Sequence, residues 1–323
     1  MSVAFLFPGQ GSQRPGMLHD LPDHPVVRDM ITQATEVLGR DVLGLDTSEA
    51  LGSTVATQLA LLVVGATAAR VLVEEGGAPD FVAGHSVGAF AAAVAAGALA
   101  YPAALRLVDL RARAMQEAYP TGYGMGVVAG LDERRVSRLA AESGTPNAPV
   151  HAANVNAPLQ VCVAGADEAL DRVLDLAREH GAHRVRRLAV PTPSHTPLMA
   201  PVAAKLERAL AAVSMVPPAV PYLSNVGGRA LRDPEEIRDD LARSVEWPVR
   251  WHDATTLLFE LGVRLFVELP PDHVLTDLAA VAFPEARAIA VADAGVGSAV
   301  TLIARHHQPS RRSRRSHGAG RPS

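Results

Sequence analysis

The chain of 323 residues is poor in cysteine, lysine and aromatic side chains. Its one cysteine, Cys162, excludes an intramolecular disulfide and a metal site made of several cysteines. The apolar neighbours of this cysteine in QVCVAG predict a buried strand thiol. Lysine occurs once, at Lys205, so the basic charge is nearly all arginine, and we draw no function from that bias. Aromatic residues make up 4% of the chain, so the core must consist mainly of alanine, valine and leucine.

The chain also has no surplus of positive charge and no segment that indicates export or a membrane. Its net charge is −4, which argues against nucleic acid as a partner. The run VAFLF near the start is too short for the core of a signal peptide and lacks a basic flank. No apolar stretch reaches membrane-spanning length without polar interruption. We therefore expect a globular, cytoplasmic protein with no membrane partner.

Strand and helix patterns alternate along the chain, which is typical of an α/β fold. Residues 3–7 form an apolar run that ends at Pro-Gly, and residues 81–83 form a second short strand before an alanine-rich helix. From about residue 124 the order becomes strand, helix, strand, strand, helix, strand, which is the order of a ferredoxin-like module. After residue 195 the alternation of helices and strands resumes, with PYLSNV as the first strand.

These patterns predict a large domain, an inserted subdomain and a tail. The large α/β domain would consist of residues 1–123 and 198–304, and the ferredoxin-like subdomain of residues 124–197 would be inserted in it. Residues 305–323 are basic and lack apolar side chains, which predicts a disordered tail. That tail is either simply solvated or in contact with an acidic partner.

The stretch GHSVG, residues 84–88, fits the pattern G-x-S-x-G. This pattern occurs where a strand turns sharply into a helix and exposes a nucleophilic serine, and both flanking elements are predicted here. Glycines permit the tight turn, and the start of a helix favours negative charge that develops at Ser86. The motif therefore predicts a nucleophile, whereas the alternative is a glycine-rich turn with an incidental serine.

A serine nucleophile needs a base and donors for the oxyanion. His195, in PTPSHTPLM, follows an apolar strand, precedes a helix and lies in a loop stiffened by prolines, which suits a base; the alternative is a capping or surface histidine. His85 adjoins Ser86, but we expect the tight turn to direct it elsewhere, to pack or to form a hydrogen bond. The backbone amides of Val87 and of Gln10, in the loop PGQGSQ, are the candidate donors.

One arginine falls on the wrong face of a predicted helix. In YPAALRLVDLRARAMQEAYP, Arg111 lies on the apolar face, one turn from Leu107 and Met115. Because burying an unpaired guanidinium costs several kcal/mol, this side chain needs a carboxylate. The partner is either an acidic residue of the protein or a substrate carboxylate bound by two guanidinium nitrogens, and the sequence leaves both possibilities open.

Taken together, these motifs resemble the malonyl-CoA:acyl carrier protein transacylase family. The resemblance covers almost the whole chain, to about residue 304, and its specificity comes from the order of its motifs. The family implies a hydrolase-like α/β core with a parallel sheet and a small ferredoxin-like insertion, in agreement with the patterns above. The matching stretches are FLFPGQGSQRPGM, GHSVGAF, LRARAMQEAYPTGYGM, ANVNAPLQVCVAG, PSHTPLM, SNVGG, PVRW and VELPPDHVL.

The resemblance assigns a role to each motif residue. It implies that Ser86 is the nucleophile, that His195 is its base and that Arg111 binds the malonyl carboxylate. It also implies that the amides of Gln10 and Val87 form the oxyanion hole.

Three further positions follow from the same resemblance. Asn154 and Asn156 match an N-x-N motif near the site. A main-chain carbonyl, not a carboxylate, would orient the histidine, and Ser244 stands where the family has glutamine. No metal or redox cofactor is implied.

Two variants of the family motifs point to a particular acceptor. Val87-Gly88-Ala89-Phe90 replaces Leu-Gly-Glu-Tyr, and Leu269-Pro270-Pro271 replaces Gly-Pro-Gly. Both variants resemble the transacylase (epsilon) subunit of bacterial malonate decarboxylase. That subunit loads malonyl onto a small acyl carrier subunit with a dephospho-CoA-derived thiol arm. The expected partners are therefore an acyl carrier protein and other decarboxylase subunits.

Three alternatives remain. The chain could load malonyl for fatty-acid or polyketide synthesis. It could instead be a serine esterase, which would need a carboxylate between Ser86 and His195 in the sequence; Asp167 and Asp171 are candidates, but both lie in a helix of the insertion. It could also be a non-catalytic subunit that binds the carrier, against which the intact serine, histidine and arginine argue.

Overall fold

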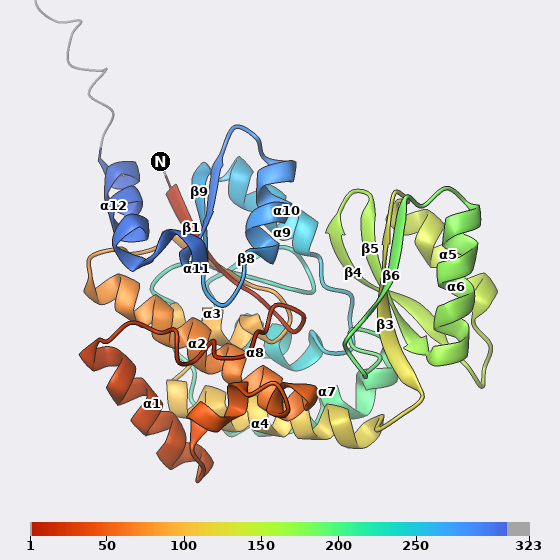
Figure 1. Cartoon of the computed structure of the whole chain (residues 1–323), viewed down its shortest axis with the longest axis horizontal. Coiled ribbons are helices and arrows are strands. Elements are labelled where there is room, and N and C mark those ends of the chain that lie inside the picture. Colours follow the sequence, from red (N-terminus) through yellow and green to blue (C-terminus); the bar gives the residue numbers. More distant parts are fainter. Residues whose placement is uncertain (1, 309–323) are drawn as a thin grey trace, which may run out of the picture.

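The computed structural model describes residues 2–308, which form two lobes around two separate sheets (Figure 1). The part from β3 to β6, residues 123–188, is called the small lobe here, and the rest is the large lobe. The predicted α/β class, with a parallel-sheet core and a ferredoxin-like insertion, is confirmed.

The large lobe is built on a six-stranded sheet with the order β10-β9-β1-β2-β7-β8. All neighbouring strands are parallel except the β7–β8 pair, so the carboxyl ends of five strands meet at one edge. The strands are β1 (Ser2–Phe7), β2 (Phe81–Gly84), β7 (Tyr222–Leu223), β8 (Ala230–Leu231), β9 (Val263–Glu268) and β10 (Arg287–Ala290).

Helices cover both faces of this sheet, because successive strand residues point to opposite sides. Phe5 and Phe7 pack into the larger core, whereas Ala4 and Leu6 pack into the core on the other face. The larger core is closed by α1 (Pro25–Leu38), α2 (Thr54–Glu74), α3 (Gly88–Ala95), α4 (Tyr101–Ala118), α7 (Ala200–Ala211), α8 (Pro234–Arg243) and α12 (Val296–His307). The opposite core is closed by α9 (Trp251–Glu260) and α10 (Val274–Ala282).

Short elements complete the lobe, and α2 is its longest helix. The short elements are the 3-10 turns η1 (Val42–Asp46), η2 (Ala50–Gly52) and η3 (Pro197–Met199), and α11 (Val291–Ala294). By length and composition α2 alone among the described residues could cross a membrane, but 94% of its apolar window is buried inside the protein. Burial on this scale is what a central core helix shows, so the feature is weak evidence for a membrane.

The small lobe is a four-stranded antiparallel sheet with the order β4-β5-β3-β6. Two helices cover one face through a small apolar core, and a second apolar cluster with Cys162 occupies the other face. The prediction that Cys162 is a buried strand thiol is confirmed, and burial raises its pKa to about 12. The elements are β3 (Tyr123–Ala129), α5 (Glu133–Ser143), β4 (Val150–Ala157), β5 (Gln160–Ala166), α6 (Asp167–Glu179) and β6 (Arg184–Leu188).

Two local predictions need correction. Helix α12 continues to His307, three residues into the predicted tail, and its basic last turn complements the negative end of the helix dipole. The remainder of that tail, from 309, lies outside the described residues. The predicted strand PYLSNV is limited to β7, because Ser224 and Asn225 leave the sheet to bind the Asp240 carboxylate.

Candidate active site

Three neighbouring parallel strands deliver three polar residues to one place. Strands β1, β2 and β7 lie side by side, with Phe7 paired to Gly84 and Ala83 to Leu223. Gln10, Ser86 and Asn225 follow the carboxyl ends of these strands within three residues. The crevice at such strand ends is where open α/β sheets bind ligands.

The turn at Ser86 is tight and strained. Ser86 has a φ of 56°, a left-handed conformation that is rare for residues other than glycine. A Cβ on Gly84 would lie 2.2 Å from the carbonyl carbon of Gly88, and one on Gly88 would lie 2.2 Å from the Phe7 oxygen. Neither position therefore has room for a side chain, and both must be glycine. The GHSVG stretch forms the predicted turn, with Ser86 just before α3.

Asn225 fastens this turn at both ends. Its side-chain oxygen accepts a hydrogen bond from the Ser86 amide, and its side-chain nitrogen donates to the Gly84 carbonyl, each at 2.9 Å. The sequence analysis did not single out this residue. The sequence signal that could have identified it is the polar pair Ser224-Asn225 at the end of the predicted strand PYLSNV.

A buried carboxylate holds Asn225 in turn. Asp240, on α8, is 4% exposed, and burial raises its pKa. Its two oxygens accept hydrogen bonds from the Tyr222 hydroxyl (2.7 Å), the Ser224 hydroxyl (2.8 Å) and the amides of Asn225 (3.1 Å) and Val226 (3.0 Å). Four donors satisfy the carboxyl without a cation and fix the loop that presents Asn225.

His195 lies within hydrogen-bond distance of the serine. Its Nε2 is 2.7 Å from Ser86 Oγ, and its Nδ1 donates to the Ser244 carbonyl at 2.6 Å. That second bond leaves Nε2 free to accept the serine proton. The His195 amide also donates to the Val245 carbonyl, which holds the residue at a φ of 64°. The main-chain carbonyl expected from the resemblance therefore occupies the place where a serine esterase has a carboxylate.

Burial and a nearby cation set the basicity of His195. Burial, and after it the positive charge of Arg111, lower the pKa of His195 to about 3. The ring is thus neutral at physiological pH, as a base must be.

Arg111 brings a buried positive charge to the serine. Its Nη2 donates to Ser86 Oγ at 3.1 Å, and its Nη1 donates to Gln58 Oε1 at 2.6 Å. The side chain is 1% exposed, and burial lowers its pKa to about 10. Among the described residues no carboxylate pairs with it, and its Nε has no acceptor. Of the two partners left open by the sequence, the internal carboxylate is therefore not found in this part of the chain.

The loop after β1 rests against the serine turn. A Cβ on Gly9 would lie 2.6 Å from the His85 carbonyl oxygen and 3.4 Å from Ser86 Cβ, so the loop approaches as closely as backbone can. The amides of Gln10 and Val87 donate to no acceptor within residues 2–308, whereas the Ser86 amide is already bound to Asn225. Two amides beside the serine therefore have a free N–H.

The two asparagines of the N-x-N motif are placed differently. Asn156 Oδ1 lies 3.1 Å from His85 Nε2, and its Nδ2 lies 3.7 Å from the sulfur of Cys162. His85 also packs edge-on against Trp251, so it points to its own partners as expected. Asn154 is buried with no partner for its Oδ1 among the described residues, and its backbone forms an isolated bridge with Val249 of the large lobe. Neither asparagine forms a hydrogen bond with Ser86.

The esterase candidates lie away from the histidine. Asp167 and Asp171 are both bound by Arg187 on the outer side of the small lobe, each at 2.7 Å. No carboxylate among residues 2–308 is bonded to His195, so the Ser-His-Asp arrangement of an esterase is not formed there.

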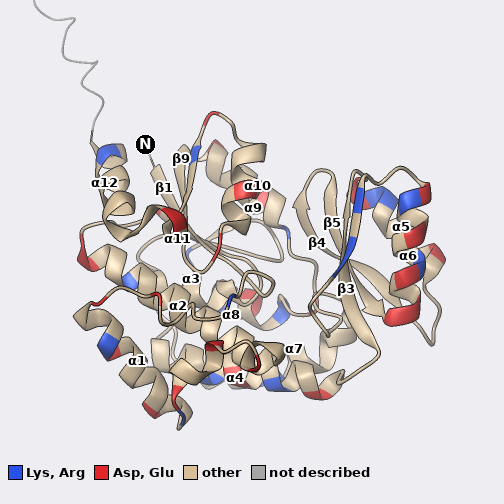
Figure 2. Ribbon diagram, in the orientation of Figure 1, with Lys and Arg blue, Asp and Glu red and all other residues tan. Residues whose placement is uncertain are grey.

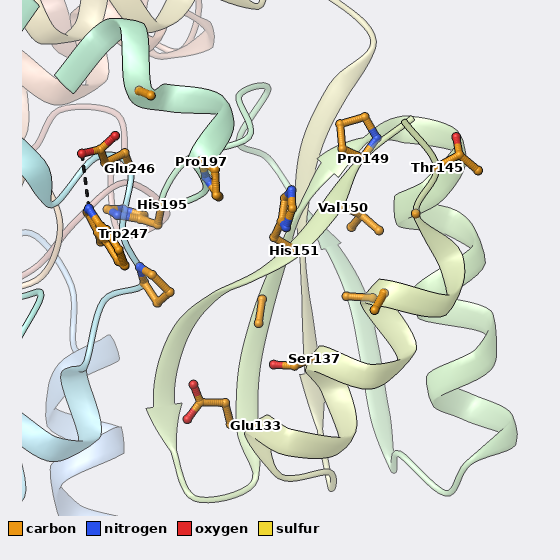
Figure 3. Close-up of a pocket in the computed structure, with 16 residues that line it drawn as sticks. Glu133, Ser137, Thr145, Pro149, Val150, His151, His195, Pro197, Glu246 and Trp247 are labelled. Atoms are coloured by element: carbon orange, nitrogen blue, oxygen red, sulfur yellow. Dashed lines mark hydrogen bonds between the residues drawn. The ribbon is translucent and has the colours of Figure 1, made fainter. Parts of the chain in front are cut away.

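A cavity of about 570 Å³ lies behind His195, along the edge strand β4 (Figure 3). His195 and Trp247 line it from the large lobe, and His151 faces them from the small lobe. Its acidic lining residues, Glu133 and Glu246, make it a poor place for an anion.

Comparison with known proteins defines the class. Residues 4–309 match the acyl transferase domain family, and the chain belongs to that family. The protein is an acyltransferase.

Its relatives narrow the class. The malonyl CoA-acyl carrier protein transacylase of Escherichia coli (strain K12) is 39% identical over 281 residues, which cover 85% of this chain and 91% of that protein. The protein of the same name from Bacillus subtilis (strain 168) is 34% identical over 296 residues, covering 90% and 93%.

Solved structures agree over nearly the whole chain. The malonyl CoA-acyl carrier protein transacylase of Coxiella burnetii superposes with a TM-score of 0.89 at 35% identity, covering 94% of this chain and 98% of that one. A malonyl-transacylase in complex with a type II PKS acyl carrier protein has a TM-score of 0.88 at 39% identity, covering 94% and 100%.

Proposed function

We propose that this protein transfers malonyl from malonyl-CoA to the thiol of an acyl carrier protein through a malonyl ester on Ser86. One observation carries the proposal: Ser86 Oγ lies between His195 Nε2 at 2.7 Å and the unpaired, buried guanidinium of Arg111 at 3.1 Å. A nucleophile, a base and an anion-binding group thus meet at one atom. The names of the relatives above support the same substrate.

The first half-reaction forms the ester. Ser86 Oγ attacks the thioester carbonyl carbon while His195 Nε2 accepts the hydroxyl proton. The amides of Gln10 and Val87 donate to the resulting oxyanion, and losing one such donor costs about 3 kcal/mol in the barrier. The carbon–sulfur bond then breaks, and the CoA sulfur leaves with the proton from His195. In the second half-reaction the carrier thiol attacks the malonyl ester by the reverse route.

Arg111 couples the choice of substrate to the strength of the base. The distal carboxylate of malonyl offers the guanidinium the anionic partner that residues 2–308 do not provide. Pairing also offsets the positive charge that lowers the pKa of His195, so the base strengthens when malonyl binds. An acetyl group supplies neither effect, which predicts discrimination against it.

The experiment is the intact mass of the protein after brief exposure to malonyl-CoA, beside Ser86→Ala. A malonyl adduct on the wild type that is absent from the variant supports the proposal. Steady CoA release without an adduct, together with turnover of simple esters, would favour the esterase alternative. Tight carrier binding with neither adduct nor release would favour the non-catalytic alternative.

The identity of the carrier protein that accepts malonyl is a separate part of the proposal. The names of the relatives favour a loader for fatty-acid or polyketide synthesis over the malonate decarboxylase role, and we propose the loader. The two motif variants, at Val87–Phe90 and Leu269–Pro271, are what supports the decarboxylase carrier as a second candidate. Transfer from the malonyl-enzyme to each carrier in turn tests the choice: a fatty-acid or polyketide carrier should accept malonyl faster than a decarboxylase carrier subunit.

The proposed chemistry needs no metal or redox cofactor. A cytoplasmic location likewise stays a prediction from the sequence.

A further inference from the structure

Two arginines of the edge strand β6 lie on the face of the small sheet that is turned away from its helices. Arg186 is paired with Val127 of β3, and Val127 is paired with Cys162 of β5. Directly paired residues of antiparallel strands point to the same side, and Arg184 follows the same face as Arg186 with the strand period of two. Both arginines therefore share the face that carries Cys162.

These arginines are exposed and lack acidic partners. Arg187, between Arg186 and Leu188, points to the opposite face and binds Asp167 and Asp171 of α6. Arg184 and Arg186 form no ion pair within residues 2–308, so two like charges stand together on one strand. In Figure 2, blue Lys and Arg positions mark the ribbon of β6, which is labelled in Figure 1. Adjacent unpaired guanidinium groups suit a phosphate, which accepts two parallel N–H bonds.

This face leads to the serine. Arg186 lies two strands from Cys162, or about 10 Å between Cα atoms. Cys162 touches Asn156, Asn156 touches His85, and His85 precedes Ser86 in the chain. The face that carries the arginine pair is thus connected to the site through Cys162, Asn156 and His85.

We propose that Arg184 and Arg186 bind the phosphate at the far end of the pantetheine arm. The inference rests on the proposed function. Malonyl-CoA and the acyl carrier protein present their thiols through the same arm, so each places a phosphate at the same distance from Ser86. The extended arm is about as long as four to five residues of extended chain, or roughly 15 Å, so its phosphate lies well beyond the groups that touch Ser86.

The opposite edge of the small sheet offers no equivalent. Beside β4 the cavity is lined by Glu133 and Glu246. Arg250, the nearby cation, is already bound to Glu133 at 2.6 Å and to Asp253 at 2.7 Å. No lysine or arginine among residues 2–308 lines this cavity, whereas β6 carries two arginines without an ion pair in that part of the chain.

Three donors of graded length test the site: malonyl-CoA, malonyl-phosphopantetheine with a single phosphate, and malonyl-pantetheine with none. The double variant Arg184→Ala/Arg186→Ala should lower kcat/KM about fivefold for the first two donors, as expected for exposed charge pairs. With malonyl-pantetheine its kcat/KM should equal that of the wild type. Arg184→Lys/Arg186→Lys, which keeps the charge, should restore most of the loss.

Arg187→Ala is the matched control, because it removes an arginine of the same strand from the other face. Its effect on kcat/KM should be the same for all three donors. An equal effect of the double variant on all three donors, or an effect on malonyl-CoA alone, would overturn the arm-phosphate site. If the wild type transfers malonyl from none of the donors, the proposed function itself fails, and the inference falls with it.

Discussion

The side-chain amide of Asn225 bridges the turn that carries Ser86, because its oxygen accepts from the Ser86 amide and its nitrogen donates to the Gly84 carbonyl. Ser86 holds a left-handed backbone there, which costs of order 1 to 3 kcal/mol unless its surroundings enforce it. The bridge supplies part of that enforcement. It also engages the Ser86 amide, so the free amide at the turn is that of Val87.

Replacing Asn225 by alanine should slow formation of the malonyl-enzyme by about ten- to a hundredfold, since two buried hydrogen bonds at the turn are lost. The measurement is the rate of adduct formation by rapid quench and intact mass. Ser224→Ala is the control, because it loses a side-chain hydrogen bond in the same loop, to Asp240, but does not touch the turn. Equal losses in both variants would mean that Asn225 acts only through the stability of its loop.

Arg111→Gln should lose the preference for malonyl over acetyl and should also shift the pH dependence. Arg111 lowers the pKa of His195, second to burial, so its removal raises that pKa. Because His195 must be neutral to act, the acid limb of kcat/KM should move to higher pH. The measurement is a pH profile for both acyl-CoA donors; an unmoved limb with intact selectivity would contradict the assigned role.

Gly88→Ala should destabilise the fold by at least about 3 kcal/mol, because the new methyl group would stand 2.2 Å from the Phe7 carbonyl oxygen, which belongs to rigid backbone. Gly297→Ala is the matched control. That glycine lies in α12, and no atom lies within 4 Å of the position that an alanine methyl group would take, so alanine should be neutral or slightly stabilising. Urea unfolding of both variants gives the comparison, and equal stabilities would refute the contact argument.

The buried carboxyl group of Glu268 should lower the free energy of unfolding as the pH rises. The carboxyl group is fully buried at the end of β9, accepts one bond from the Thr276 amide at 2.6 Å, and has a pKa raised to about 7 by burial. The neutral carboxyl group therefore contributes fully to the free energy of unfolding below about pH 4.5, and this contribution is lost as the pH rises through about 7. Glu268→Gln should remove this dependence, changing the wild-type-minus-variant difference by about 3 kcal/mol between about pH 4 and 8. Parallel urea titrations would show it; a constant difference would argue against the raised pKa.

The sequence predicted the residues that break a local rule. Arg111 was conspicuous because a guanidinium on an apolar helix face needs a partner, and Ser86 because two glycines enclose it between a strand and a helix. Gln58 carried a similar signal as a polar side chain within a long apolar helix, yet an uncharged amide in a helix has many ordinary explanations.

Residues that act through loops were harder to foresee. Asn225 and Asp240 lie fifteen residues apart and meet only because the loop after β7 folds back onto α8. No local pattern encodes that contact. The carbonyl of Ser244 is likewise invisible in a sequence, because any residue type provides one.

The division into two lobes separates the groups around Ser86 from the arginine pair of β6. Every group bonded to Ser86 Oγ is anchored to the large lobe, since His195 is held there by the backbone of Ser244 and Val245. Arg184 and Arg186 belong to the small lobe, which is tied across by Asn156 to His85 and by Glu133 to Arg250. The reacting atoms and the proposed phosphate site therefore belong to different lobes, and the contacts between the lobes fix the span between them.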